Sequence, residues 1–203
     1  MIIERISEGI FDSNCYIVAQ DNEGILIDAG VETEKIFRTI NNLNVNIKQV
    51  VITHCHIDHI MYCSEIKNKT GADVYIHEID SDDFTNPLNN GALLFGYEFT
   101  PVKPDKELKD GEIVVVGNMN LKIINTPGHT PGSICIKIGN NIFTGDTLFN
   151  MSIGRTDLYN GNYDDIIDSI NNKIMCYDDS VIVYPGHGPS TTIGYERNNN
   201  PFL

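Results

Sequence analysis

Short apolar runs rich in β-branched residues recur along the first half of the chain. The runs predicted as strands, bounded by turn formers, are Ile2–Ile6, Cys15–Ala19, Gly24–Ala29, Gln49–Thr53 and Asp73–His77. A helical spacing of apolar residues covers Thr33–Leu43. A second predicted helix begins near His59 and ends before Gly71, a residue type that favours helix C-caps.

The second half repeats this theme. Its predicted strands are Glu112–Val116, Asn118–Asn125, Ser133–Ile138, Asn141–Thr144 and Val181–Tyr184, with one helix over Tyr163–Met175. Two β-rich halves that each carry helices predict an α/β protein with two sheets face to face and helices outside. Ser81–Pro104 has weak periodicity and is interpreted as a mobile loop or lid. The asparagines Asn198–Asn200 are interpreted as a solvated loop or tail.

The composition is that of a globular protein. With 203 residues, 41% hydrophobic and 21% charged, the chain is predicted to form one domain over residues 1–203. It shows neither a signal peptide nor a membrane span, so a cytoplasmic protein is expected. A formal net charge of −14 disfavours nucleic acid as a partner. The five cysteines are scattered without a Cys-x-x-Cys pair, which favours reduced thiols.

The segment THCHIDHI, residues 53–60, crowds titratable groups at the end of a predicted buried strand. His54 and His56 are two residues apart, so on an extended chain they point at one centre. Asp58 and His59 follow where the chain turns into a helix, which aims them at a second centre nearby. A lone histidine is more often structural, and Asp58 alone is compatible with a helix N-cap. Together the four indicate a site for two metal ions.

Three later segments each place one further ligand-type residue in a turn after a predicted strand. His129 lies in NTPGHTPGS, Asp146 in FTGDTLF and His187 in VYPGHGPST. Each alone is compatible with an ordinary turn residue. Together they bring five of the six histidines to strand-end loops, where sites are commonly built.

These motifs, in this order, resemble the metallo-β-lactamase-fold hydrolases along nearly the whole chain. The phrases TGDTLF, SIGRTDL, PGHGPSTTIGYE and NPFL resemble the small glyoxalase-II-like (hydroxyacylglutathione hydrolase-like) branch. The resemblance implies a four-layer αββα sandwich with a dinuclear site at one edge. It implies that one metal is bound by His54, His56 and His129, the other by Asp58, His59 and His187, with Asp146 bridging. The best-studied lactam-cleaving group has cysteine at the bridging position, so Asp146 argues against a β-lactamase.

The resemblance further implies hydrolysis of a small-molecule thioester by a hydroxide held between two divalent ions. Zinc is expected, and iron or manganese is also compatible with these ligands. Asp58 would accept a proton during catalysis. Arg155 would bind the carboxylate of an acidic thiol carrier, or would be an ordinary ion-paired arginine.

Several neighbours of these motifs receive secondary roles. Asp28 is expected to orient a ligand without binding metal, and Cys55 to point away from the site. His77 is interpreted as structural. Tyr159 and Tyr184 are candidates for the pocket wall.

Rival functions remain open from the sequence. Persulfide dioxygenases resemble this pattern but use one iron, bound at the positions of His54, His129 and Asp146. A lactone or phosphoester hydrolase is a second rival, and a non-catalytic metal-dependent binding protein is a third. Two departures limit the transfer from the family. Ile60–Cys63 stands where the family often has glycines, which bears on the shape of the adjacent pocket. The C-terminal helical region with which full-length glyoxalase II helps bind glutathione has no counterpart here, so glutathione specificity is not implied. The sequence does not fix the oligomeric state.

Overall fold

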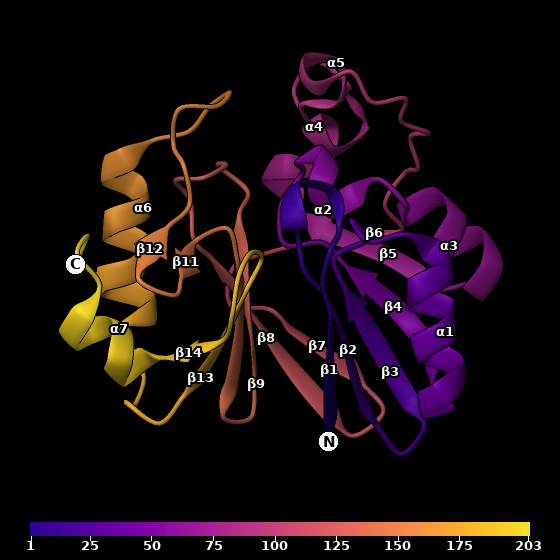
Figure 1. The fold of residues 1–203 in the computed structure, drawn as a ribbon, viewed down its shortest axis with the longest axis horizontal. Helices are drawn as coiled ribbons and strands as arrows, with labels where there is room; N and C mark the ends of the chain where they lie inside the picture. Colours follow the sequence, from indigo (N-terminus) through magenta and orange to yellow (C-terminus); the bar gives the residue numbers. More distant parts are fainter.

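The computed structural model describes residues 1–203 as two six-stranded sheets packed face to face, with helices on both outer faces (Figure 1). This arrangement confirms the predicted αββα sandwich. None of the helices has the length and apolar character needed to cross a membrane.

The first sheet is built from the N-terminal half of the chain. In spatial order its strands are β1 (Ile2–Ile6), β2 (Cys15–Gln20), β3 (Glu23–Ile27), β4 (Asn46–Val51), β5 (Asp73–His77) and β6 (Lys106–Leu108). β1 to β3 pair antiparallel and β3 to β6 pair parallel. Its outer face is covered by α1 (Thr33–Leu43) and α3 (Cys63–Thr70) (Figure 1).

The second sheet comes from the C-terminal half. In spatial order its strands are β14 (Thr191–Thr192), β13 (Ile182–Pro185), β10 (Asn141–Gly145), β9 (Ile134–Ile138), β8 (Met119–Asn125) and β7 (Ile113–Val116). Its outer face carries α6 (Tyr163–Ser169), continued by a π-helical turn (Ile170–Ile174), and α7 (Ile193–Asn199). A small hairpin, β11 (Leu148–Phe149) and β12 (Ser152–Ile153), lies at one end.

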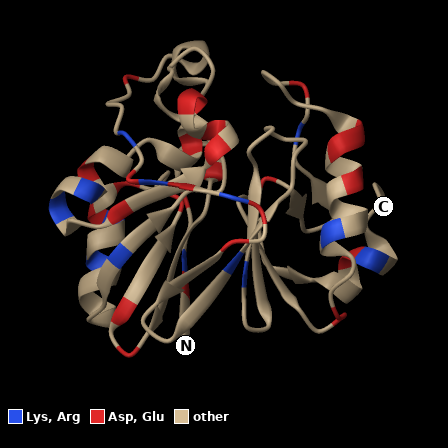
Figure 2. Ribbon diagram, turned by 180° about the vertical axis from the view of Figure 1, so that it is seen from behind, with Lys and Arg blue, Asp and Glu red and all other residues tan.

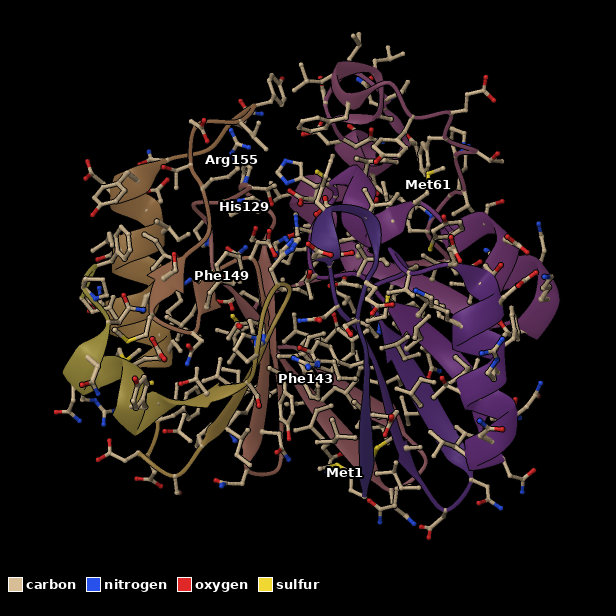
Figure 3. The ribbon with its side chains drawn as sticks, viewed as in Figure 1. Met1, Met61, His129, Phe143, Phe149 and Arg155 are labelled. Atoms are coloured by element: carbon tan, nitrogen blue, oxygen red, sulfur yellow. The ribbon has the colours of Figure 1, made fainter.

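The central strands are buried on both faces, which explains their continuous apolar runs. Along β2, Tyr16 faces the core between the sheets, whereas Ile17 faces the core beneath the helices. On β10, Phe143 lies between the sheets (Figure 3), with its ring centroid 5.3 Å from Tyr16 and 5.0 Å from Tyr184. The adjacent Ile142 packs with α6 instead. One strand thus joins two hydrophobic cores.

Strand direction sets where the functional loops lie. β3, β4 and β5 run parallel in one sheet, and β8, β10 and β13 share a direction in the other. The loops that leave the carboxyl ends of these strands meet at one edge of the sandwich, the upper edge in Figure 1. Such an edge is where open α/β sheets place their ligands.

Most predicted elements are confirmed, with two informative differences near THCHIDHI. The helix Thr33–Leu43 has its predicted bounds, and Gly71 caps α3 at a φ of 71°. The helix expected near His59 is divided into α2 (Ile57–Ile60) and α3. β4 ends at Val51, not at Thr53, because the Thr53 N–H donates to the Asp28 carboxylate instead of continuing the ladder.

Two segments interpreted as loops contain helix, and the mobility of Ser81–Pro104 stays a prediction. Ser81–Pro104 begins as helix α4 (Ser81–Thr85), which directly follows a 3-10 turn (Glu78–Asp80), and it also contains α5 (Ala92–Phe95). Phe84 and Ala92 from this segment are fully buried in the first sheet's helix-facing core. Helices of four or five residues are too short to give a detectable period. Asn198 and Asn199 belong to α7, and buried Asn200 donates to Glu196.

Candidate metal centre

The loops at this edge bring together every predicted metal ligand. His54 and His56 follow β4, Asp58 and His59 lie on α2, and the remaining three follow β8, β10 and β13 as His129, Asp146 and His187. All are buried except Asp58 and His187, which are partly exposed. The separate sequence motifs therefore come together at one place in the structure.

His54, His56 and His129, here called the first cluster, converge through their ring nitrogens. Nδ1 of His56 lies 2.8 Å from Nε2 of His129, and the latter lies 3.2 Å from Nε2 of His54. Cys55, between two of these residues, belongs to none of the ligand groups, as expected.

Asp58, His59 and His187, here called the second cluster, converge in the same way. Nε2 of His187 lies 3.1 Å from Oδ2 of Asp58 and 3.3 Å from Nε2 of His59. Asp58 Oδ2 and His59 Nε2 are 3.4 Å apart. Each cluster offers three ligand atoms within 4.8 Å of one another, the minimum set for a metal in a protein site.

Asp146 lies between the two clusters. Its Oδ2 is 3.6 Å from Nε2 of His129 and 3.5 Å from Nε2 of His187, and its Oδ1 is 3.3 Å from Nε2 of His59. Oδ1 is buried and has no hydrogen-bond partner. A buried carboxylate oxygen without a hydrogen-bond partner is costly, so this atom is suited to bind a cation.

Backbone carbonyls fix the protonation of two histidines. Nδ1 of His129 donates to the Arg155 carbonyl oxygen at 2.7 Å, and Nδ1 of His187 donates to the Phe11 carbonyl oxygen at 3.1 Å. A carbonyl oxygen only accepts, so the proton of each neutral ring is on Nδ1. The Nε2 lone pairs of both rings therefore face the centre.

Asp28 and Thr53 likewise fix which ring nitrogen carries the proton, in His59 and His54 respectively. Asp28 Oδ2 accepts from Nδ1 of His59 at 2.8 Å and from the Thr53 hydroxyl at 2.9 Å. Because that hydroxyl donates to Asp28, its oxygen accepts from Nδ1 of His54 at 3.1 Å. Asp28 thus orients a ligand without belonging to the ligand groups, as expected from the sequence.

The consequence is a set of unprotonated nitrogens that face one another. Nε2 of His54 and Nε2 of His129 are 3.2 Å apart without a proton between them. Two lone pairs at that distance repel, whereas a divalent cation accepts both. The residues present therefore fit a metal centre.

Burial and neighbouring charges shift the pKa values of histidines in the two clusters in opposite directions. Burial, followed by His59 and the other histidines, lowers the pKa of His54 well below its usual range, and burial followed by His129 lowers that of His56 to about 3. Both are neutral at physiological pH. Burial alone would lower the pKa of His59, but Asp58, Asp146 and Asp28 raise it well above the ordinary value.

Glycines permit this close packing. A Cβ atom added to Gly186 would lie 2.2 Å from Oδ1 of Asp146 and 2.8 Å from Cε1 of His59. No larger residue fits there without displacing the cluster. The Gly/Pro setting of His187 is thus a steric requirement of the site as well as a turn.

Asp80 is a site residue that the sequence analysis missed. Its fully buried carboxylate accepts from the Cys55 N–H at 3.0 Å, the Thr130 hydroxyl at 2.7 Å and the Gly132 N–H at 2.7 Å. Cys55 lies between His54 and His56, and Thr130 follows His129. Asp80 therefore joins the two loops that carry the first cluster. The one sequence signal is its position just beyond the end of β5, the neighbour of β4.

A cavity of about 440 Å³ opens over the clusters. It is lined by His56, Asp58, His129, Asp146 and His187, by Arg155, and by the apolar side chains of Phe11, Phe95, Phe149, Ile153 and Leu158. Arg155, His129 and Phe149 lie together at this edge (Figure 3). Acidic residues of α4 and α6 mark the two sides of this edge of the sandwich in red (Figure 2).

Two pocket-wall candidates were wrong. Tyr184 packs between the sheets against Tyr16 and Phe143, because the alternation along β13 turns it inward. Tyr159 does not line the cavity and is 54% exposed. His77 is buried outside the clusters, consistent with a structural role.

The structure is an αββα sandwich with a histidine–aspartate centre at the carboxyl ends of its strands. The sequence model of the metallo-β-lactamase superfamily matches residues 9–188. The chain belongs to this superfamily.

Three known proteins extend the comparison. Hydroxyacylglutathione hydrolase GloC of Haemophilus influenzae is 36% identical, over all of this chain and 98% of its own. The crystal structure of BLEG-1, described as a B3 metallo-β-lactamase, superimposes with a TM-score of 0.95 at 33% identity and covers 100% of this chain and 99% of its own. TTHA1623, solved in a di-iron-bound form, has a TM-score of 0.89 at 28% identity, over 98% of this chain and 100% of its own.

Substitution of Asp80 tests the connection between the two loops. Asp80→Ala leaves the N–H groups of Cys55 and Gly132 buried without an acceptor, so the free energy of unfolding should fall by about 2 to 4 kcal/mol. Metal affinity should fall about 10- to 100-fold, measured by competition with a chromophoric chelator. Asp82→Ala, an exposed position on α4, is the matched control and should leave both quantities unchanged. Wild-type metal affinity in Asp80→Ala would contradict the positioning role.

Metal binding should weaken as the pH falls. Burial lowers the pKa of His59, but the surrounding carboxylates raise it by more. At His187, too, the effect of Asp58 and Asp146 exceeds that of burial and raises the pKa. The metal-free second cluster therefore holds protons that an ion must displace. The apparent affinity should fall about tenfold per pH unit for each proton displaced. Chelator competition between pH 8 and pH 6 measures this slope, and an affinity independent of pH would rule out displacement.

Proposed function

We propose that this chain hydrolyses a small-molecule thioester to a carboxylic acid and a thiol at two divalent ions bound by the clusters. The single observation that carries the proposal is the convergence of unprotonated histidine nitrogens and a partnerless Asp146 oxygen on the floor of the cavity. The similarity to GloC, a hydroxyacylglutathione hydrolase, supports the thioester class.

The first cluster would hold one ion and the second cluster the other, with Asp146 between them. Bound ions would polarise the substrate carbonyl and lower the pKa of water to about 7. Zinc suits the imidazole and carboxylate ligands, and iron and manganese suit them as well. The di-iron form of TTHA1623 supports iron as the main competitor of zinc.

The remaining steps are assigned to side chains of this chain. Asp58 lines the cavity with its carboxylate and would accept the proton released when water adds to the carbonyl. Beyond the cluster residues, the cavity lining contains no Lys, Tyr, Glu or Cys that could protonate a poor leaving group, so only Asp58, after it has accepted that proton, could do so. A thiolate, whose parent thiol has a pKa of about 8.5, departs without such an acid. This favours a thioester over an ester or an amide.

Arg155 is the cation available to a substrate carboxylate. It lines the cavity, and its guanidinium binds Asp157 through two bonds, Nε–Oδ1 at 2.7 Å and Nη2–Oδ2 at 2.8 Å. Both side chains are more than half exposed. An exposed ion pair contributes little to stability, so a carboxylate of an acidic thiol carrier would replace Asp157 at small cost.

The function is tested by metal quantification of the purified protein followed by a substrate panel. We expect two ions per chain and a higher kcat/KM for thioesters, including S-lactoylglutathione, than for lactones, phosphodiesters or β-lactams. Lactams belong in the panel because BLEG-1 is described as a B3 metallo-β-lactamase. Asp146→Asn should lose both metal and activity, whereas the control His77→Gln, outside the clusters, should keep both.

Two outcomes would contradict the proposal. One iron per chain with oxygen uptake on a thiol persulfide would indicate a dioxygenase. Full metal loading without turnover of any panel member would favour a metal-dependent binding protein.

The role of Arg155 is tested by a pair of substitutions. Arg155→Ala should raise KM for an acidic thioester about tenfold and leave KM for a neutral thioester unchanged, because one charged hydrogen-bonded contact is lost. Asp157→Ala should act in the opposite direction, since it frees the guanidinium. Equal KM values for the acidic thioester in wild type and Arg155→Ala would remove the carboxylate-binding role.

A further inference from the structure

The cavity has a strongly uneven distribution of polar and apolar groups. Apart from Arg155, every polar residue of its lining belongs to the clusters or is Asp146. The rest of the lining is hydrocarbon, supplied by Phe11, Phe95, Phe149, Ile153 and Leu158. A substrate placed over the clusters therefore meets apolar side chains wherever it does not meet Arg155.

Three phenylalanines gather beside the second cluster and are here called the aromatic wall: Phe11, Phe95 and Phe149. The Phe11 carbonyl oxygen accepts from His187, and the Phe149 ring lies 5.8 Å from the His187 ring at 78°. Phe95 packs edge-on against Phe11, with ring centroids 4.9 Å apart. The wall comes from three distant segments and surrounds one ligand.

Arg155 is hydrogen-bonded through its backbone to the first cluster. Its carbonyl oxygen accepts from His129, a member of the first cluster. A thioester lying across both clusters therefore has one end near Arg155 and the other near the aromatic wall. If the acidic thiol carrier is bound by Arg155, the acyl group lies against the wall.

The wall is exposed to solvent. Phe11 is 50% and Phe95 40% exposed, and the same short helix as Phe95 exposes Leu93 and Leu94. Neighbouring exposed apolar side chains at the mouth of a cavity mark a ligand-binding surface. Covering them with hydrocarbon is favourable, whereas a charged acyl group would find no Lys or Arg among the side chains of the wall.

We propose that the site selects thioesters whose acyl group is an extended alkyl or aromatic hydrocarbon, bound by Phe11, Phe95 and Phe149. This inference rests on the proposed thioester hydrolysis. A short hydroxyacyl group such as lactoyl leaves most of the wall in contact with water. It is therefore the poorer substrate.

The test uses acyl thioesters of one neutral thiol, N-acetylcysteamine, so that Arg155 makes no charged contact. The acyl groups are lactoyl, acetyl, butyryl, hexanoyl and phenylacetyl. We expect kcat/KM to rise about threefold per added methylene from acetyl to hexanoyl, and lactoyl to rank near acetyl. Hexanoate should also inhibit more strongly than lactate, which measures binding without turnover.

Variants of the wall separate selectivity from folding. Phe95→Ala and Phe149→Ala should lower the ratio of kcat/KM for hexanoyl to kcat/KM for acetyl about tenfold. Phe202→Ala is the matched control, because Phe202 is 43% exposed and lies outside the cavity. It should preserve the dependence on chain length.

The outcomes distinguish acyl selectivity from thioester hydrolysis itself. Hydrolysis with no dependence on the acyl group, or with a preference for lactoyl, would overturn the acyl selectivity and leave thioester hydrolysis standing. A chain-length dependence that persists in Phe95→Ala and Phe149→Ala would overturn the role of the wall. No hydrolysis of any thioester would overturn the proposed function and this inference with it.

Discussion

The crowding of ligand-type groups at one edge of the sandwich is the constraint on which the rest of the structure depends. The Nε2 lone pairs of His54 and His129 face each other at 3.2 Å, and the carboxylates of Asp58 and Asp146 lie beside His187. Such an arrangement is unfavourable by itself, because burial removes the water that would solvate each group. A metal ion converts the same contacts into ligand bonds, so the geometry of the protein without metal is already that of a ligand set.

The fold holds this arrangement because the loops are short and their strands are rigid. The core between the sheets, with Phe143 and Tyr16 at its centre, fixes the ends of β4, β10 and β13 relative to one another. Three buried features then set the loops: Asp28 orients His59, Asp80 joins the loops of the first cluster, and Gly186 leaves room beside Asp146. The stability of the sandwich thus offsets the cost of the site.

The sequence predicted the fold and the convergence of the candidate ligands well because their signals are local. The helix Thr33–Leu43 and the strand Asp73–His77 have the predicted bounds, and each ligand lies directly after a buried apolar run. Asp80 also follows a strand, but its role was not predictable from that position, because its partners Thr130 and Gly132 are about fifty residues away. The aromatic wall was equally hidden, because an isolated phenylalanine in a sequence is as compatible with the core as with a cavity.

The histidines of the two clusters depend on their neighbours in an unusual way. His129 and His187 are oriented by the main-chain carbonyls of Arg155 and Phe11, the same residues whose side chains line the cavity. Every amino acid carries that carbonyl, so mutation at either position preserves the hydrogen bond while it replaces the surface offered to the substrate. Substitutions at these two positions therefore change the substrate preference while the orientation of the histidines is retained.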